Sequence, residues 1–68
     1  MKEININSEF IKLEQLLKMV DLISSGGESK SFILNNKIEV NDELETRRGR
    51  KLRSGDVIKI LDQTYKIC

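Results

Sequence analysis

The sequence predicts an α+β fold in which two N-terminal helices pack on a small, mostly antiparallel sheet. Apolar residues recur at helical spacing in the first half of the chain, whereas after Lys37 they alternate with polar residues at a period of two. The length of 68 residues allows one domain, spanning residues 1–68. Its core must be built mainly from Ile, Leu and Val, because the only aromatic residues are Phe10, Phe32 and Tyr65.

The first elements are a short strand and a helix. Residues 2–6 alternate, with Ile4 and Ile6 on one side, and we expect a half-buried strand that pairs with the C-terminal strand. Ser8 is a candidate N-cap for a first helix over residues 9–19. The apolar face of this helix is formed by Phe10, Leu13, Leu16, Leu17 and Val20.

A second helix is predicted over residues 26–35. Ser25 and Glu28 have the spacing of a capping box, in which each satisfies a free backbone N–H group of the first turn. Asn36 is a candidate left-handed terminator, because Asn tolerates that conformation. The buried side of this helix is predicted to carry Phe32, Ile33 and Leu34.

The rest of the chain is predicted to form the sheet. Ile38 and Val40 alternate with polar residues, and the dipeptide Asn41-Asp42 favours a tight turn into a second hairpin strand at residues 43–45. The remaining turn and two strands are predicted over residues 53–56, 57–61 and 64–67.

The positive charge of the chain is concentrated in one stretch, residues 46–53, called the basic segment below. Five of its eight residues are cationic, which leaves seven basic against 11 acidic residues elsewhere, a net charge of −4. A polyanion responds to the field within about 10 Å rather than to the net charge. Phosphate-binding is therefore favoured over a merely solvated turn, with contacts from Arg47, Arg48, Arg50, Lys51 and Arg53.

The start of the second helix is a further candidate anion site. Ser25, Gly26 and Gly27 have little or no side chain, so a phosphate can approach the free N–H groups there. Simple capping explains the same residues, and the spacing is not that of a nucleotide-binding P-loop. Phe10 and Phe32 are expected in the core, and Tyr65 is expected to serve packing rather than base stacking.

Catalysis and metal binding are not expected. The chain has no histidine, its single cysteine is Cys68, and the acidic residues are spread over positions expected to face solvent. We expect no enzyme activity, no cofactor and no disulfide. No apolar run approaches the ~20 residues of a membrane span, and residues 1–5 lack a signal-peptide core, so a cytoplasmic monomer without membrane contact is expected.

Five motifs follow one another in a specific order. They occupy residues 11–17 (IKLEQLL), 24–30 (SSGGESK), 38–41 (IEVN), 47–52 (RRGRKL) and 55–56 (GD). In this order they resemble the S-four (S4) RNA-binding domain, named for the fourth protein of the small ribosomal subunit, over residues 10–61. The SGGE and RRGRK variants are similar to small stand-alone bacterial members of the YaaA type.

The resemblance implies a fold and a binding surface. In that family the two helices form an L-shaped surface that docks on structured RNA, with the sheet as support and the basic loop beside it. Lys12, Lys18 and Lys30 extend the basic patch across the helices. Of these three, Lys12 and Lys30 match the family motif. Asn41 either contacts RNA or holds its turn. The full set of implied RNA-binding residues is Lys12, Ser25, Gly26, Gly27, Lys30, Asn41, Arg47, Arg48, Arg50, Lys51 and Arg53.

Four residues depart from the family pattern. Ser29 replaces a usual Ala, and its hydroxyl is expected to bond back to a helical carbonyl. Asn36 and Asp42 stand where Gly is commoner, and both residue types tolerate positive φ. Gly26 stands where many branches have Arg, which transfers binding there to backbone N–H groups and the basic segment.

The function expected from these observations is non-catalytic binding of structured RNA, ribosomal or transfer RNA, by a ribosome-associated or assembly factor. RNA is preferred over DNA mainly because of the resemblance, although A-form duplexes, which are read by shape and phosphates, suit a surface without base-reading side chains. The alternative is a protein-interaction module that attaches to a ribosomal or replication protein.

Overall fold

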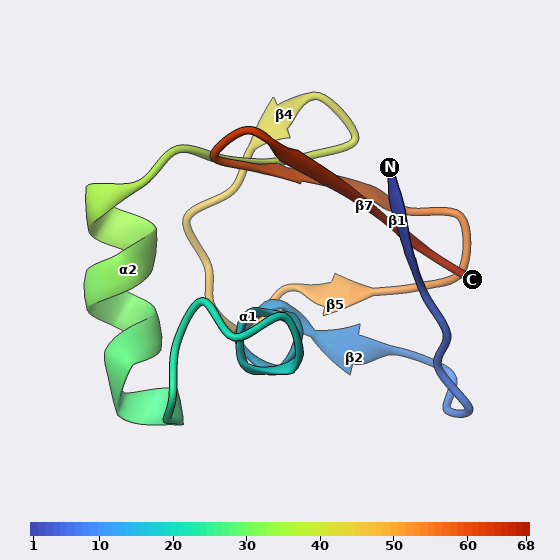
Figure 1. Ribbon diagram of the computed structural model, residues 1–68, viewed down its shortest axis with the longest axis horizontal. Helices are drawn as coiled ribbons and strands as arrows, with labels where there is room; N and C mark the ends of the chain where they lie inside the picture. Colours follow the sequence, from blue (N-terminus) through green and yellow to red (C-terminus); the bar gives the residue numbers. More distant parts are fainter.

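The computed structural model describes residues 1–68, and two helices lie on one side of a sheet (Figure 1). The predicted α+β class with a mostly antiparallel sheet is confirmed. The helices are α1 (Leu13–Met19) and α2 (Ser29–Asn35), and a 3₁₀ turn at Gly26–Glu28 leads into α2. The strands are β1 (Lys2–Ile4), β2 (Ile11–Lys12), β3 (Ile38–Val40), β4 (Glu43–Leu44), β5 (Lys51–Leu52), β6 (Val57–Ile60) and β7 (Gln63–Ile67).

Five strands form the main sheet in the order β1-β7-β6-β3-β4. The predicted pairing of the N-terminal and C-terminal strands is confirmed: β1 runs parallel to β7, with Lys2 opposite Tyr65, and every other neighbouring pair is antiparallel. The remaining strands, β2 and β5, form a separate antiparallel pair in which Lys12 lies opposite Lys51.

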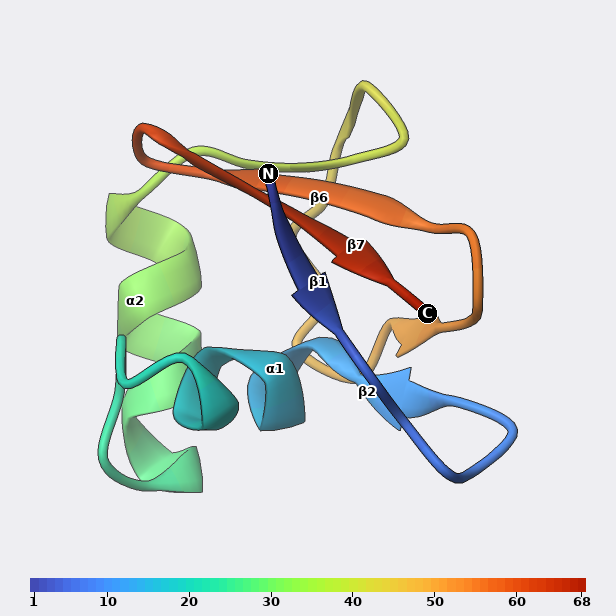
Figure 2. The same ribbon diagram turned by 45° about the vertical axis from the view of Figure 1, so that its right-hand side comes forward.

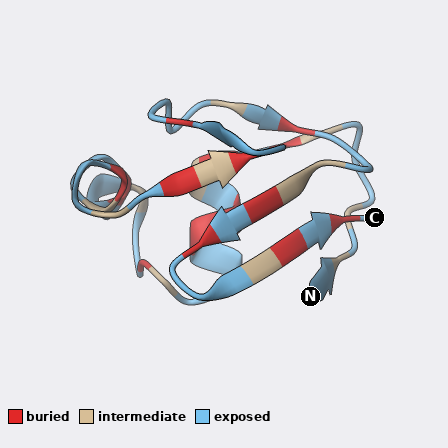
Figure 3. Ribbon diagram, turned by 90° about the horizontal axis from the view of Figure 1, so that it is seen from above, coloured by how far each residue is buried: buried red, intermediate tan, exposed pale blue.

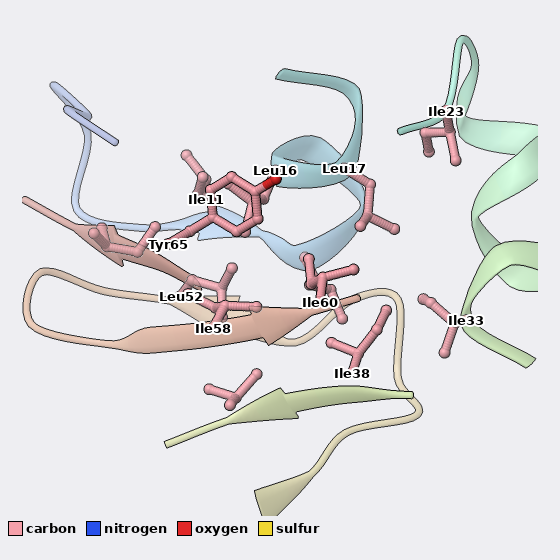
Figure 4. Close-up of a cluster of buried hydrophobic side chains, with 13 residues drawn as sticks. Ile11, Leu16, Leu17, Ile23, Ile33, Ile38, Leu52, Ile58, Ile60 and Tyr65 are labelled. Atoms are coloured by element: carbon pink, nitrogen blue, oxygen red, sulfur yellow. The ribbon is translucent and has the colours of Figure 1, made fainter. Parts of the chain in front are cut away.

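The hydrophobic core lies between the main sheet and a second layer made of α1 and the β2–β5 pair (Figure 4). Buried and exposed residues alternate along the central strands, as Figure 3 shows. The core contains mainly aliphatic side chains, and the predicted packing role of Tyr65 is confirmed because only 2% of this residue is exposed. The buried apolar residues are Ile11, Leu13, Leu16, Leu17, Ile23, Ile33, Ile38, Val40, Leu52, Ile58, Ile60, Tyr65 and Ile67.

Helix α1 begins later than the sequence predicts. The expected helix over residues 9–19 starts only at Leu13, because Ile11 and Lys12 pair with β5 instead. Ser8 is not the N-cap: its hydroxyl donates to the carbonyl of Phe10 at 2.9 Å. The N-cap is Lys12, whose backbone N–H donates to Oε1 of Gln15 at 2.7 Å. A long-range strand pairing thus overrides the local helical periodicity.

A left-handed residue ends α1. Asp21 has φ of 61°, and its N–H bonds to the carbonyl of Lys18, while the N–H of Leu22 bonds to that of Leu17. This arrangement is a Schellman motif, which satisfies the free carbonyls of the last turn. The chain then turns, and α2 runs across the end of α1, so that the two helices form the arms of an L (Figure 2).

The helical region over residues 26–35 is confirmed, with its first turn in the 3₁₀ form. The capping box predicted for Ser25 and Glu28 is wrong, because Ser25 makes no side-chain cap. Instead Glu28 accepts the N–H of Ser24 at 2.6 Å and the Ser24 hydroxyl at 3.0 Å. The left-handed terminator predicted at Asn36 is also wrong: its φ is −137°, and its side-chain amide donates to the carbonyl of Phe32.

The hairpin prediction for β3 and β4 is confirmed. Asn41 and Asp42 form its turn with φ of 52° and 69°, so Asp42 does take the conformation for which Gly is commoner. The β6–β7 turn lies one residue earlier than expected, because Ile60 pairs with Gln63 and Leu61 has φ of 57°.

Ser29 is fully buried, and its hydroxyl donates to the carbonyl of Gly26 at 2.7 Å, which confirms the expected bond to a helical carbonyl.

Candidate nucleic-acid interface

The basic segment follows β4, contains β5 and lies against the start of α1 (Figure 1). The N–H of Leu13 donates to the carbonyl of Arg50 at 2.9 Å, and the N–H of Glu14 donates to that of Arg48 at 3.0 Å. These are two of the donors that a helix start otherwise leaves free. The main chain of the basic segment is therefore held by hydrogen bonds to the start of α1, although the two lie far apart in the sequence.

One buried carboxylate organises the first half of the segment. The side chain of Glu45 is only 6% exposed, and it lies between the guanidinium groups of Arg47 and Arg50. Its Oε2 accepts Nε of Arg47 at 3.0 Å, and its Oε1 accepts Nη1 of Arg50 at 2.9 Å. The backbone N–H groups of Thr46 and Arg47 also donate to Oε2. The expectation that the acidic residues all face solvent is wrong for Glu45.

These contacts fix the charge state of the cluster. The side-chain hydrogen bond from Arg47 lowers the pKa of Glu45 to about 2, against the opposing effect of burial. The same pair raises the pKa of Arg47. Glu45 therefore stays ionised at neutral pH and offsets one of the five cations, so the segment and this carboxylate together carry four net positive charges.

The cations of the segment surround an open hollow of about 530 Å³. No hydrophobic side chain lines it. A concave surface lined by one sign of charge concentrates counter-ions more strongly than a flat patch does. The lining residues are Arg47, Gly49, Arg50, Lys51 and Arg53, so the structure brings together four of the five predicted cations, and Arg48 is exposed outside the lining.

Two residues of the β2 region extend this site. Lys12 is exposed and lies opposite Lys51 in the antiparallel pair, which places both side chains on the same face. Phe10 is half-buried and is not part of the core, so the core prediction for it is wrong. Two cations lie over its ring: Nζ of Lys51 is 4.9 Å from the ring centroid, and the guanidinium carbon of Arg53 is 5.5 Å from it. Phe32, by contrast, packs against the core as expected.

The start of α2 lies on the same side of the molecule as α1 and the β2–β5 pair, away from the main sheet (Figures 1 and 2). Ser25 and Gly27 are exposed there, and Gly26 is half-buried. A Cβ added at Gly26 would meet nothing within 4 Å, so packing inside the chain does not require glycine at this position. Lys30 is exposed on α2, and α1 lies between α2 and β2 in Figure 2.

Asn41 lies in the β3–β4 turn, and Asp56 links it to the end of the basic segment, because the Asp56 carboxylate also accepts the backbone N–H of Arg53 at 2.8 Å. Both ends of its side-chain amide are engaged: Nδ2 donates to Oδ1 of Asp56 at 3.0 Å, and Oδ1 accepts the N–H of Val57 at 3.0 Å. Of the two roles expected for Asn41, these bonds favour the one of holding the turn.

Sequence reasoning missed Glu45 and Phe10. Neither the burial of Glu45 nor the cations over the Phe10 ring can be read from one element, because both arise where separate segments meet. A partial signal was present for Glu45, since an acid two and five residues before two arginines is within reach of both. No group of three or more His, Cys, Asp or Glu side chains is placed to hold a metal ion. None of the helices is long and apolar enough for a membrane crossing.

The fold and the hollow define a small α+β domain with an L-shaped pair of helices and a cationic face beside them. Residues 4–68 match the family described as the S4 domain, and the chain belongs to that family, which confirms the resemblance drawn from its motifs. It is also similar to "Probable ribosome maturation protein RlbA" of Bacillus subtilis (strain 168). The two are 51% identical over 57 residues, which cover 84% of this chain and 80% of that protein.

Proposed function

We propose that this protein binds structured RNA without catalysing a reaction, as a ribosome-associated factor that acts in ribosome maturation. The observation that carries the proposal is the hollow lined by four cations and Gly49 with no apolar side chain. Such a surface suits the closely spaced phosphates of a folded RNA, which supply affinity with little sequence information. Membership of the S4 domain family and the name of the Bacillus subtilis relative, a probable ribosome maturation protein, support RNA of the ribosome as the target.

The proposed interface has two parts on one side of the molecule. The basic segment supplies phosphate contacts from Arg47, Arg48, Arg50, Lys51 and Arg53, and Lys12 continues this surface along β2. The start of α2 supplies a second area formed by Ser25, Gly26, Gly27 and Lys30, where small residues allow close approach of the RNA backbone. The protein acts as a monomer in the cytoplasm, and its rigid surface reads RNA shape and phosphates rather than bases.

The test is binding to a structured ribosomal-RNA fragment and to a matched DNA duplex over a salt series. Lys51→Gln/Arg53→Gln removes two lining cations and leaves the Glu45 cluster intact. The double substitution Arg47→Ala/Arg50→Ala is a poorer choice, because it leaves a buried carboxylate without its cations. The matched control is Lys2→Gln/Lys66→Gln, which removes the same charge from exposed positions on β1 and β7.

The wild type is expected to prefer RNA. The variant at Lys51 and Arg53 is expected to bind about tenfold or more weakly, with a salt slope shallower by about 2, because each phosphate contact contributes roughly one unit. The control is expected to keep the wild-type slope. Absence of binding to either nucleic acid at moderate salt would overturn the proposal.

A second candidate is attachment to a ribosomal protein. Leu34 and Leu44 are 72% and 65% exposed, and both line an open hollow of about 300 Å³ between the end of α2 and β4. Co-sedimentation with ribosomal particles separates the two functions. If Leu34→Ser/Leu44→Ser abolishes co-sedimentation and Lys51→Gln/Arg53→Gln does not, the contact is made to protein.

A further inference from the structure

The four cations that line the hollow fall into two pairs, and each pair is held by one residue that does not line it. Glu45 holds Arg47 and Arg50 through a carboxylate at 3.0 and 2.9 Å. Phe10 holds Lys51 and Arg53 through its ring, at 4.9 and 5.5 Å from the centroid. The lining of the hollow itself includes neither Glu45 nor Phe10.

Glu45 is an unusual residue to find inside a cationic cluster. Its side chain is 6% exposed, and both carboxylate oxygens accept hydrogen bonds from within the chain. The donors are Thr46, Arg47 and Arg50, so the carboxylate is satisfied without solvent or a ligand. Arg47 keeps 71% of its side chain exposed and Arg50 keeps 31%, so both retain surface with which to meet a ligand. The carboxylate therefore orients the two arginines without covering them.

Phe10 has an equally specific place. It is half-buried and lies outside the apolar core, in the residue just before β2. A ring face attracts cations, and Arg or Lys side chains over it are restricted in the rotamers they adopt. Lys51 belongs to β5, which pairs with β2, and Arg53 is the first residue after β5. The strand pairing therefore brings both cations to this ring.

We propose that Glu45 and Phe10 are the positioning residues of the hollow, which hold its four cations in place before RNA arrives. This inference rests on the proposed function. Long Lys and Arg side chains lose rotamer freedom when they are fixed on a ligand, so fixing them in the free protein removes part of that cost from binding. The arrangement makes the hollow a preformed phosphate site rather than a set of independent mobile charges.

The direction in which one substitution changes RNA affinity distinguishes a preformed site from independent charges. Glu45→Gln removes a negative charge from the centre of the cationic cluster. If the cations act as independent charges, RNA affinity rises, because the local field becomes more positive. If Glu45 positions Arg47 and Arg50, affinity falls, because each arginine must then be ordered on binding, at a factor of about 2 to 12 per side chain.

The experiment measures RNA affinity at one moderate salt concentration for the full chain. Glu45→Gln is expected to bind about fivefold or more weakly than the wild type. The matched control is Glu43→Gln, which removes the same charge from an exposed position on β4 with no cation bound to it, and it is expected to bind as tightly as the wild type or more tightly. Circular dichroism and thermal melting confirm that each variant is folded.

Phe10 gives a second, independent arm. Phe10→Leu keeps an apolar side chain and the net charge but removes the ring, and it is expected to weaken RNA binding about threefold. Phe10→Tyr keeps the ring and is expected to restore wild-type affinity, which a merely space-filling role would not require. If Glu45→Gln does not fold, the comparison of Phe10→Leu with Phe10→Tyr decides the matter.

The outcomes separate the inference from the function on which it rests. If the wild type binds RNA, and if Glu45→Gln binds as tightly as Glu43→Gln while Phe10→Leu binds like the wild type, the positioning role is overturned and RNA binding stands. If the wild type does not bind RNA, both proposals fall together.

Discussion

The backbone N–H of Leu13 donates a 2.9 Å hydrogen bond to the carbonyl oxygen of Arg50, so the first turn of α1 is capped by main chain from the basic segment. A second bond joins the N–H of Glu14, one residue further along α1, to the carbonyl of Arg48, two residues earlier in the basic segment. Each bond satisfies a free N–H group of the helix start and a carbonyl group of the basic segment at once, so the two elements stabilise each other. The cations of the segment therefore project from a backbone that belongs to the framework of the fold.

The acid stability of the protein is expected to depend on Glu45. Its pKa is lowered from 4.5 to about 2, so its contribution to the free energy of unfolding is complete above about pH 5 and is lost as the pH falls toward 2. That contribution is at most about 3 kcal/mol, and solvent around the exposed Arg47 reduces it. Urea unfolding at pH 7, 4 and 2 is expected to show a smaller pH dependence for Glu45→Gln than for the wild type. Equal pH dependence in the two proteins would contradict this role.

Ser29 is expected to contribute to the contact between the two helices. Its buried hydroxyl donates to the Gly26 carbonyl at 2.7 Å and lies 3.4 Å from Oε2 of Glu14 in α1. Ser29→Ala is expected to lower the free energy of unfolding by about 1 kcal/mol through loss of the hydroxyl hydrogen bond. Ser29→Leu is expected to cost more, roughly 1–3 kcal/mol, because the site is filled. Chemical denaturation measures both, with Ser54→Ala at an exposed turn position as the neutral control.

The side chain of Asn41 is expected to act on stability rather than on binding. Asn41→Gly keeps the positive φ but loses the bonds to Asp56 and Val57, so the free energy of unfolding is expected to fall by about 1–2 kcal/mol. Asn41→Asp places a second carboxylate beside Asp56. Its deficit relative to the wild type is expected to be largest at pH 7 and to shrink on acidification, because protonation of either acid removes the repulsion.

The pKa of Asp56 provides the readout for that comparison. Burial raises the pKa of Asp56, but the hydrogen bonds from the Arg53 backbone and the Asn41 amide, together with the charges of Arg50 and Arg53, leave it lowered in the wild type. In Asn41→Asp the amide donor is gone, so a rise of the Asp56 pKa is expected in an NMR titration. An unchanged Asp56 pKa would mean that the amide does not support the carboxylate.

Alanine substitutions at the two glycines before α2 test RNA binding separately from folding. Packing leaves open space at Gly26 and only a 3.9 Å contact at Gly27, and neither has positive φ. Alanine at either position is therefore expected to leave stability unchanged or to raise it by up to about 1 kcal/mol, since Ala favours the helix. If the RNA backbone approaches this helix start, the same substitutions weaken RNA binding in a filter-binding assay. Unchanged RNA affinity would remove this area from the interface.

The features predicted correctly from the sequence are those with a pattern that is visible within one short segment. The Asn41-Asp42 turn is one example, because the two residue types that tolerate positive φ stand side by side between alternating strands. The pairing of β1 with β7 and the buried role of Tyr65 followed from alternation in the two terminal segments. The cationic residues of the hollow were found because charge concentration is visible in a single stretch.

The errors arise where a distant segment competes with a local pattern. Ile11 continues the helical periodicity of α1, yet its pairing opposite Leu52 draws it into a strand. Glu28 has two serines within reach, and the chain uses Ser24 rather than Ser25, a choice that depends on the backbone path before the 3₁₀ turn. The burial of Glu45 depends on the arginines that fold back over it, and no pattern in residues 43–45 indicates this.

The two hydrogen bonds between α1 and the basic segment also bear on how relatives of this chain diverge. An insertion between Arg48 and Arg50 would change the spacing of the two carbonyls that cap α1, so we expect it to weaken the start of the helix. The exposed side chains of Arg48, Lys51 and Arg53 take no part in these two bonds or in the Glu45 cluster. Point substitutions at these three positions can therefore change what the segment binds, while the main chain that displays them keeps its place against α1.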